Sequence, residues 1–528
     1  MYSSASGLPP GAMQLRRPAA YTTKTAFNVA LRCWCHLQRW PLRRRFLLCY
    51  VLCELFALWR FRLRLARLRI PRLGERRGTT GDLQWILQSM KHSVCPMGLS
   101  RASLQRYFPE TKRRQKSITW EHYYAIVADA FAIRGPSPDE HLLLMQIAAA
   151  SAQAQGLPAP PLTSKPPTCR APVGYGSGEL NVVYKPLPLE LLIAGIRLLG
   201  EAVIRALGFR GRWLPTPEGW MRYWVSRPSD CTSTCSPAVF IHGVGLGAVP
   251  YIPLIRKLRQ GRQGTLVILE LPNCSRSHFQ QSMPSPASFR NAFETLLQRE
   301  LGISSPGSYV LIGHSLGTDY CTMVLNDPRM GHSDSILRPA RVVLLDPICF
   351  AHEQLDAHRL PFWTCREAIE KTAVWWPLQL AVLFLVIRDE YNQEATKRAL
   401  VPGTDTIFRL SPELRRRCKI LVCLSGNDQA LPAWQIHDYV RSQMPDVEVR
   451  IDPGLEHGGF LNPLNPGWLA QIHADAMLRF LGVSDVPRVS SHPAAFGGEE
   501  QDIPMKRNSR SELCLGQSQT KPGGNGYA

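Results

Sequence analysis

Three features that would define other classes of protein are missing from this chain of 528 residues. It has no stretch of eighteen or more uncharged apolar residues, which excludes a protein with several membrane-spanning helices. Its fifteen cysteines show no repeated spacing and no histidine partners at zinc-ligand distance, so no metal site is expected and a reducing compartment is favoured. Basic residues do not alternate with aromatic ones along any stripe, so nucleic-acid binding is not expected.

What the chain does contain is typical of a large globular protein. Apolar residues make up 45%, aromatic residues 9% and charged residues 20%. This is too apolar for a disordered chain, and the length exceeds that of one ordinary domain. We therefore expect one large core with appendages.

Positive charge is concentrated in residues 1–77. They contain sixteen Lys or Arg but only two acidic residues, Glu54 and Glu75, and so account for +14 of the formal net charge of +21. Residues 46–59 form an apolar run that would extend about 21 Å as a helix, short of the roughly 30 Å of a bilayer core. The arginines and leucines of residues 60–69 are typical of a helix in an anionic headgroup layer.

Residues 1–78 are therefore predicted to be a basic, amphipathic segment that associates with a membrane surface, on its cytoplasmic or an organellar face. Two alternatives remain for this segment. An Arg-rich start with Ser and Thr also fits a cleavable transit peptide for an organelle, and a basic helix can simply dock on the fold. The oligomeric state does not follow from the sequence.

The next segments alternate between helical and irregular patterns. Residues 79–155 are predicted to be a helical extension with helices near 83–90, 118–133 and 141–153, followed by a proline-rich linker at 156–172. A long amphipathic helix is predicted at 188–207. Residues 483–528, rich in Ser, Pro, Gly and Gln, are expected to be a disordered tail.

Short apolar runs separated by helical stretches predict an α/β fold with a mostly parallel sheet flanked by helices. The core is predicted in two parts, 173–349 and 418–482, separated by an insertion at 350–417. The predicted strands are residues 238–241, 266–269, 309–312, 342–345, 420–424 and 447–451, with helices at 288–301 and 316–325 among them.

A G-x-S-x-G sequence centred on Ser315 follows one of these strands and opens a helix. Strand, sharp turn and helix are what a nucleophile elbow requires, and the two glycines are expected because the turn leaves no space for a Cβ. A serine needs a base, and that base needs an orienting carboxylate. His457 and Asp428 follow in the expected order, each in a loop after a strand, with Asp346 as the alternative acid.

The developing oxyanion would need two backbone donors, for which we expect the amides of Leu316 and Val244. Val244 lies in the loop after the first predicted core strand. The first two residues of that loop, His242 and Gly243, are candidates for the substrate pocket. For His242 we expect a turn-stabilising hydrogen bond, the alternative being a second catalytic base. Neither a metal nor a cofactor is expected.

With these residues in place, the stretch from about 239 to 481 resembles the α/β-hydrolase superfamily, in its serine esterase and lipase-like branch. FIHGVGLG and LLDPICF are also similar to a eukaryotic, largely fungal-type group of such hydrolases that carry N-terminal apolar segments. The resemblance implies an eight-stranded type of sheet, a helical cap inserted after the sixth strand, and ester hydrolysis through an acyl-enzyme. The long basic and helical N-terminal half departs from the general fold.

The insertion at 350–417 is rich in Trp and Leu, and residues 374–387 are almost wholly apolar. Trp363, Trp375 and Trp376 are candidates for a pocket that receives an acyl chain, although a buried helix fits the pattern nearly as well. The leading hypothesis is a membrane-associated serine hydrolase of lipophilic carboxylic esters. The alternatives are a catalytically silent scaffold that binds a membrane or partner, and an acyltransferase using the same triad.

Overall fold

The structure is a computed structural model. It describes residues 41–68, 80–87, 117–158, 182–227, 236–275, 283–350, 389–397, 408–461 and 477–481, with short gaps inside several of these ranges.

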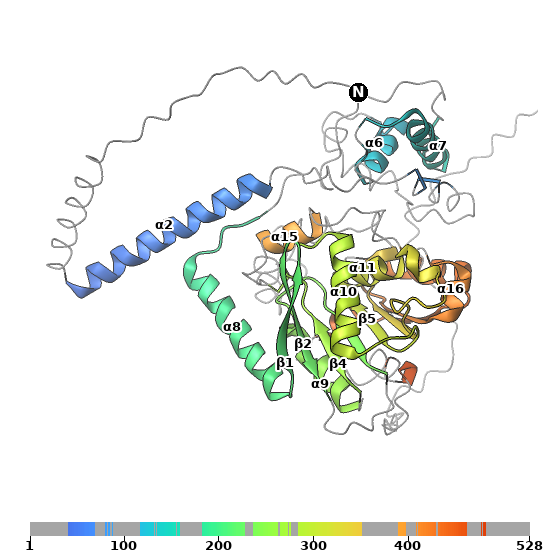
Figure 1. Ribbon diagram of the computed structural model, residues 1–528. Helices are drawn as coiled ribbons and strands as arrows, with labels where there is room; N and C mark the ends of the chain where they lie inside the picture. Colours follow the sequence, from blue (N-terminus) through green and yellow to red (C-terminus); the bar gives the residue numbers. More distant parts are fainter. Residues whose placement is uncertain are drawn as a thin grey trace, which may run out of the picture. The chain divides into compact units, whose positions relative to one another are not determined.

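An eight-stranded sheet forms the centre of the fold (Figure 1), with the strand order β1-β2-β4-β3-β5-β6-β7-β8. The strands from β3 to β8 pair in parallel. They are β3 (Ala238–Ile241), β4 (Leu266–Leu269), β5 (Val310–His314), β6 (Arg341–Leu345), β7 (Lys419–Ser425) and β8 (Glu448–Asp452). All six predicted strands are therefore confirmed, to within one or two residues at each end.

Two strands were not predicted. β1 (Arg210–Thr216) and β2 (Gly219–Ser226) form an antiparallel hairpin, and β2 pairs antiparallel with β4. Their sequences mix arginine and tryptophan with apolar residues, because β1 is largely exposed whereas β2 is buried on both faces. Arg222 of β2 is buried and forms an ion pair with Glu201, which a pattern of apolar residues cannot reveal.

Helices and short 3₁₀ turns connect the strands. Four helices have the following bounds: α8 (Leu187–Ala206), α9 (Ile252–Gly261), α10 (Pro286–Leu301) and α11 (Leu316–Leu325). Towards the C-terminus follow α15 (Glu390–Lys397), α16 (Pro412–Arg417) and α17 (Ala433–Gln443). The 3₁₀ turns are η2 (Val249–Tyr251), η3 (Pro328–Gly331), η4 (Ile348–Phe350) and η7 (Gly459–Leu461). The predicted helices at 188–207, 288–301 and 316–325 are confirmed.

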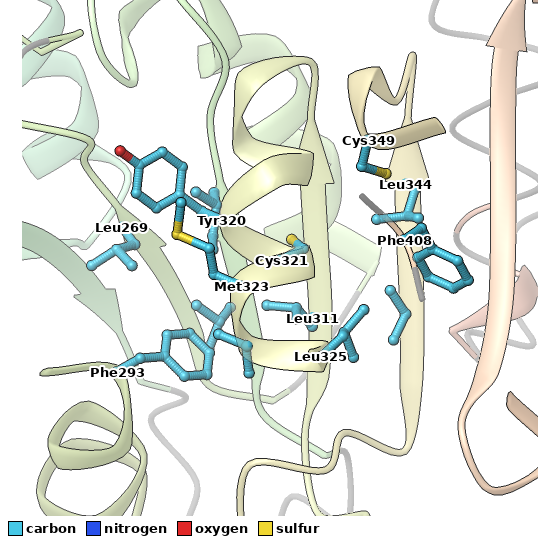
Figure 2. Packing of buried hydrophobic residues seen from close by; sticks show 14 of the residues in the cluster. Leu269, Phe293, Leu311, Tyr320, Cys321, Met323, Leu325, Leu344, Cys349 and Phe408 are labelled. Atoms are coloured by element: carbon cyan, nitrogen blue, oxygen red, sulfur yellow. The ribbon is translucent and has the colours of Figure 1, made fainter. Parts of the chain in front are cut away.

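Helix α11 lies in the middle of the hydrophobic core. Every one of its residues from Leu316 to Leu325 is buried, including the polar residues Thr318, Asp319 and Thr322. Figure 2 shows Cys321 and Met323 of this helix close to Leu311 of β5. The rigid packing of α11 against the sheet fixes the position of the turn that precedes it.

The N-terminal region contributes three described helices: α2 (Leu42–Leu68), α6 (Trp120–Ala130) and α7 (Pro138–Ala154). α6 and α7 pack against each other around a small apolar cluster that includes Tyr123, Val127 and Leu144. This agrees with the helices predicted at 118–133 and 141–153. Within the part of the chain that the structure describes, no helix is long and apolar enough to cross a membrane.

Several predicted segments lie mainly or wholly outside the described residues. These are the proline-rich linker, the tail at 483–528, and most of the insertion at 350–417, including Trp363, Trp375 and Trp376. Of the insertion, α15, α16 and a few neighbouring residues are described.

Candidate active site

The site lies at the carboxyl ends of the parallel strands. The chain passes from β3 outwards to β4 and then crosses to β5 on the other side of β3. At such a reversal of strand order, the loops after the two neighbouring strands separate and leave room for a ligand. The loop after β3 and the turn after β5 are therefore the parts of the sheet that meet at the site.

Ser315 occupies a strained turn between β5 and α11. Its backbone has φ 49° and ψ −121°, a combination that a residue with a side chain rarely adopts, and its amide donates to the carbonyl of Leu345 at 3.0 Å. The surrounding packing of α11 holds this strain. The turn presents the Ser315 hydroxyl beyond the edge of the sheet, as a nucleophile elbow does.

The two glycines of the motif are required by space. A Cβ at Gly313 would come within 2.6 Å of the Cys321 sulfur and 3.0 Å of the Gly317 carbonyl oxygen. A Cβ at Gly317 would collide with the carbonyl oxygen of Ile241 in β3. The turn therefore packs directly on the end of β3.

The structure brings Ser315, His457 and Asp428 together. His457 Nε2 is 3.0 Å from Ser315 Oγ, and His457 Nδ1 is 2.7 Å from Asp428 Oδ2. Asp428 follows β7, and its other oxygen accepts from the amide of Leu431 at 2.9 Å. A hydroxyl, an imidazole and a carboxylate in this order form the arrangement that activates a serine.

The charge of Asp428 changes the acidity of the imidazole. Burial of the His457 ring disfavours its charged form, but the negative charge of Asp428, the hydrogen bond to Asp428 and the more distant charge of Asp346 outweigh it. Together they raise the pKa of His457 to about 9. The imidazolium that forms when the ring takes a proton is thus stabilised.

Asp346, the alternative acid, has a different set of partners. Its side chain accepts hydrogen bonds from the amide and hydroxyl of Ser425, at 2.8 and 2.9 Å, and from the amide of Gly458 at 2.8 Å. It therefore joins the ends of β6 and β7 to the loop that carries His457. Its backbone has a positive φ of 42°, which directs the carboxylate into this position.

His242 lies behind the site rather than on its surface. Its ring is fully buried, its Nε2 accepts from the amide of Leu271 at 3.0 Å, and its Nδ1 is 2.7 Å from the carbonyl oxygen of Gly243. Burial lowers the pKa of His242 to about 4, although the hydrogen bond to Gly243 opposes the shift. These contacts correct the assignment of His242 to the substrate pocket, because a fully buried side chain does not line an accessible surface.

Tyr251 was not among the residues predicted for the site. Its hydroxyl accepts from the amide of Gly243 at 2.8 Å and lies 2.7 Å from His314 Nδ1. His314 is thus part of a buried hydrogen-bonded group. Its pKa is well below the usual value because of burial and the neighbouring His457 and His242 rings. Together Tyr251 and His314 hold the loop after β3 next to Ser315.

Gly243 is buried and its backbone lies close to the Cβ of Ser315. A Cβ at this position would lie 2.9 Å from the Ser315 Cβ, 2.9 Å from the Tyr251 hydroxyl and 3.0 Å from His314 Nδ1. The loop can approach Ser315 this closely only because residue 243 has no side chain. Val244, the next residue, is partly exposed at the site.

The amide of Leu316 is placed to donate to a bound ligand. Leu316 is the first residue of α11, so its N–H has no acceptor within the helix and lies at the positive end of the helix dipole. The second expected donor, the amide of Val244 in the loop after β3, stays a prediction.

One group of side chains has donors that would suit a metal ion. Asp346, Asp428 and His457 each offer one atom, and these atoms lie within 4.8 Å of one another. The same atoms already serve other partners: both His457 nitrogens face Ser315 and Asp428, and Asp346 holds Ser425 and Gly458. Each of these three side chains therefore already has hydrogen-bond partners within the protein.

Comparison with known proteins defines the class. Residues 238–472 match the model of the alpha/beta hydrolase family, a range that includes β3 to β8, Ser315, Asp428 and His457. This part of the chain is therefore an α/β-hydrolase domain, as the sequence predicted. A search of curated proteins gave no match.

Solved structures that resemble the chain include several esterases. A carboxylesterase of Bacillus subtilis is 17% identical, with a TM-score of 0.38, over 54% of this chain and 98% of its own. The naproxen esterase of Bacillus subtilis is 16% identical, with a TM-score of 0.36, over 55% and 98%. An esterase of Pyrobaculum calidifontis is 14% identical, with a TM-score of 0.36, over 56% and 89%.

Proposed function

We propose that this protein hydrolyses carboxylic esters through an acyl-enzyme formed on Ser315. The observation that carries the proposal is the position of His457, which lies within hydrogen-bond distance of Ser315 on one side and Asp428 on the other. A serine hydroxyl becomes a useful nucleophile only when a base removes its proton. A structural histidine would have no need of both partners at the carboxyl edge of the sheet.

In the first half of the reaction, Ser315 Oγ attacks the carbonyl carbon of the ester while His457 Nε2 takes the hydroxyl proton. The carbonyl oxygen gains negative charge, which the amides of Leu316 and Val244 stabilise. The tetrahedral intermediate then collapses, the bond to the alcohol oxygen breaks, and His457 returns its proton to the leaving alcohol. The acyl group remains on Ser315.

In the second half, a water molecule attacks the acyl carbon while His457 removes one of its protons. Collapse of this intermediate releases the carboxylic acid and restores the Ser315 hydroxyl. Asp428 keeps the ring of His457 oriented and stabilises the imidazolium at both stages. The apolar sequence of residues 374–387 supports a lipophilic ester as the substrate.

The proposal is tested by labelling with a fluorophosphonate, which reacts with activated serines, and by hydrolysis of p-nitrophenyl esters of increasing chain length. The wild type is expected to label and to hydrolyse the esters, and Ser315→Ala should do neither while keeping the wild-type circular dichroism spectrum. Equal labelling of the two proteins would show that Ser315 is not the nucleophile. A folded wild type that neither labels nor hydrolyses would indicate a silent scaffold, and acyl transfer to an added alcohol in preference to water would indicate an acyltransferase.

A further inference from the structure

Large apolar side chains that remain exposed are concentrated on two helices outside the catalytic site. Of the twenty such residues in the described part of the chain, sixteen lie on α2 or α8. Leu191, Leu198 and Leu199 of α8 are 70, 65 and 68% exposed, and Phe46 and Phe56 of α2 are 67 and 57% exposed. A protein that works alone in water seldom leaves so many large apolar side chains together at its surface.

Glu54, the single acidic residue of α2, joins the two helices. Its carboxylate accepts from the amide of Leu187 at 3.0 Å and from the Tyr184 hydroxyl at 2.8 Å. Leu187 is the first residue of α8, so its amide has no acceptor within the helix and favours a negative charge nearby. The Phe61 ring of α2 also packs edge-on against Tyr184. We call the exposed apolar faces of α2 and α8, joined in this way, the two-helix surface.

The opposite face of α8 is fixed to the hydrolase domain. Ile193, Gly200, Glu201 and Ile204 are buried, and Glu201 forms a bidentate ion pair with Arg222 of β2. Gly200 packs so closely on the neighbouring turn that a Cβ there would lie 2.5 Å from a methyl carbon of Val249. α8 therefore cannot rotate to bury its leucines, and they stay at the surface.

The charges around the two-helix surface indicate what covers it. α2 contains seven arginines and one glutamate, and that glutamate is engaged by α8. Arg43 and Arg44 are exposed before the apolar residues of α2, and Arg60 and Arg62 are exposed after them. A second copy of the chain would bring the same positive charges to the contact and repel the first. An anionic bilayer offers an apolar phase bordered by phosphates, which matches both the leucines and the arginines.

We propose that the two-helix surface binds an anionic phospholipid membrane, with apolar side chains of both α2 and α8 entering the interfacial layer. α8 is thus a second membrane-binding element besides the basic N-terminal segment. The site is separate from Ser315 and its partners, and the proposal does not depend on the reaction that they catalyse.

The test compares binding of the full chain to phosphatidylcholine vesicles with and without phosphatidylserine. The wild type is expected to sediment with the vesicles, more tightly when phosphatidylserine is present, and less tightly as salt is added. The double variant Leu191→Glu with Leu198→Glu should bind at least about tenfold more weakly, because two exposed leucines no longer leave water. The matched control is Leu142→Glu. Leu142 is 45% exposed but belongs to α7 and not to the two-helix surface, so this variant should bind like the wild type.

Three results would overturn the proposal. The first is wild-type protein that stays in solution with every vesicle, and the second is a double variant that binds as tightly as the wild type. The third is self-association of the wild type, abolished in the double variant and unaffected by vesicles, which would make the surface an interface between two copies. Fluorophosphonate labelling without vesicles should be equal in the wild type and the double variant, so failure of membrane binding and failure of the esterase proposal are distinguished.

Discussion

The carboxylate of Asp346 accepts a hydrogen bond from the amide of Gly458, 2.8 Å away, and so holds the loop in which His457 lies. The residue after β6 thus fixes the position of a residue after β8, although these strands are not neighbours in the sheet. Two acids therefore surround the imidazole in different roles: Asp428 bonds the ring itself, and Asp346 bonds the backbone beside it.

Replacement of the two acids should separate these roles. Asp428→Asn removes the charge that orients the ring and stabilises the imidazolium, so kcat is expected to fall by about 10⁴-fold with little change in KM, as in serine proteases. Asp346→Asn exchanges an acceptor for a donor opposite Ser425 and Gly458, and should lower kcat only about 10- to 100-fold while lowering the melting temperature. Steady-state kinetics with a p-nitrophenyl ester and thermal unfolding measure both. A larger loss of kcat in Asp346→Asn would make Asp346 the orienting acid.

The activity should depend on pH through His457. The ring must be neutral to accept the serine proton, and its pKa is raised to about 9, so kcat/KM is expected to rise with pH and to level off above that value. Asp428→Asn should move the midpoint to lower pH, because the charge that favours the imidazolium is gone. Because the folded pKa exceeds the ordinary value of 6.5, His457 stabilises the fold fully below pH 6.5 and loses that contribution as the pH rises towards 9. A wild-type midpoint below pH 6.5 would contradict this account.

Tyr251 is predicted to position the oxyanion donors. Tyr251→Phe removes the acceptor of the Gly243 amide and the partner of His314, which should cost about 1–3 kcal/mol of stability. Because the loop after β3 loses this support beside Ser315, kcat is also expected to fall, with KM nearly unchanged.

The matched control is Tyr309→Phe. Tyr309 is also buried, and its hydroxyl donates to the carbonyl of Leu337, but it lies at the other end of β5. It should lose similar stability in urea unfolding without any change in kcat. Equal effects of the two substitutions on kcat would mean that Tyr251 has only a structural role.

Lys185 and Asp389 form a buried ion pair between the segment before α8 and the start of α15. Their side chains are 2 and 0% exposed, and Lys185 Nζ lies 2.6 Å from Asp389 Oδ2. Lys185→Met leaves the aspartate buried beside Glu390 without its cation, so we expect a loss of about 3–5 kcal/mol in urea unfolding.

The double variant Lys185→Met with Asp389→Asn provides the control. It removes both charges of the pair and should recover part of the lost stability, since the fully buried carboxylate no longer lacks a cation and only the more exposed Glu390 stays charged. If the single variant is as stable as the wild type, the pair contributes nothing to the fold.

The three side chains that the structure brings together could be selected from the sequence because each has a local signal. Ser315 stands in a motif between a strand and a helix, and Asp428 and His457 each follow a strand whose carboxyl end meets the same edge of the sheet. The parallel strands were also visible, since they are continuous apolar runs.

The features that the sequence did not reveal depend on partners far along the chain. The hairpin of β1 and β2 was missed because the arginine that is buried in it is neutralised by Glu201 of α8. The role of Tyr251 depends on Gly243 and His314, and the role of Glu54 depends on Leu187, 133 positions later. No pattern of apolar and polar residues records such pairings.

The tight contact at Gly243 limits which residues this position can hold. Any larger residue there would clash with Ser315, Tyr251 and His314 at once, so we expect homologues to keep glycine at this position. Val244, the next residue, is half-buried and packs against the hydrophobic core, so a change of side chain is easier to accommodate there than at Gly243. Homologues are therefore expected to differ from this chain at Val244 more often than at Gly243.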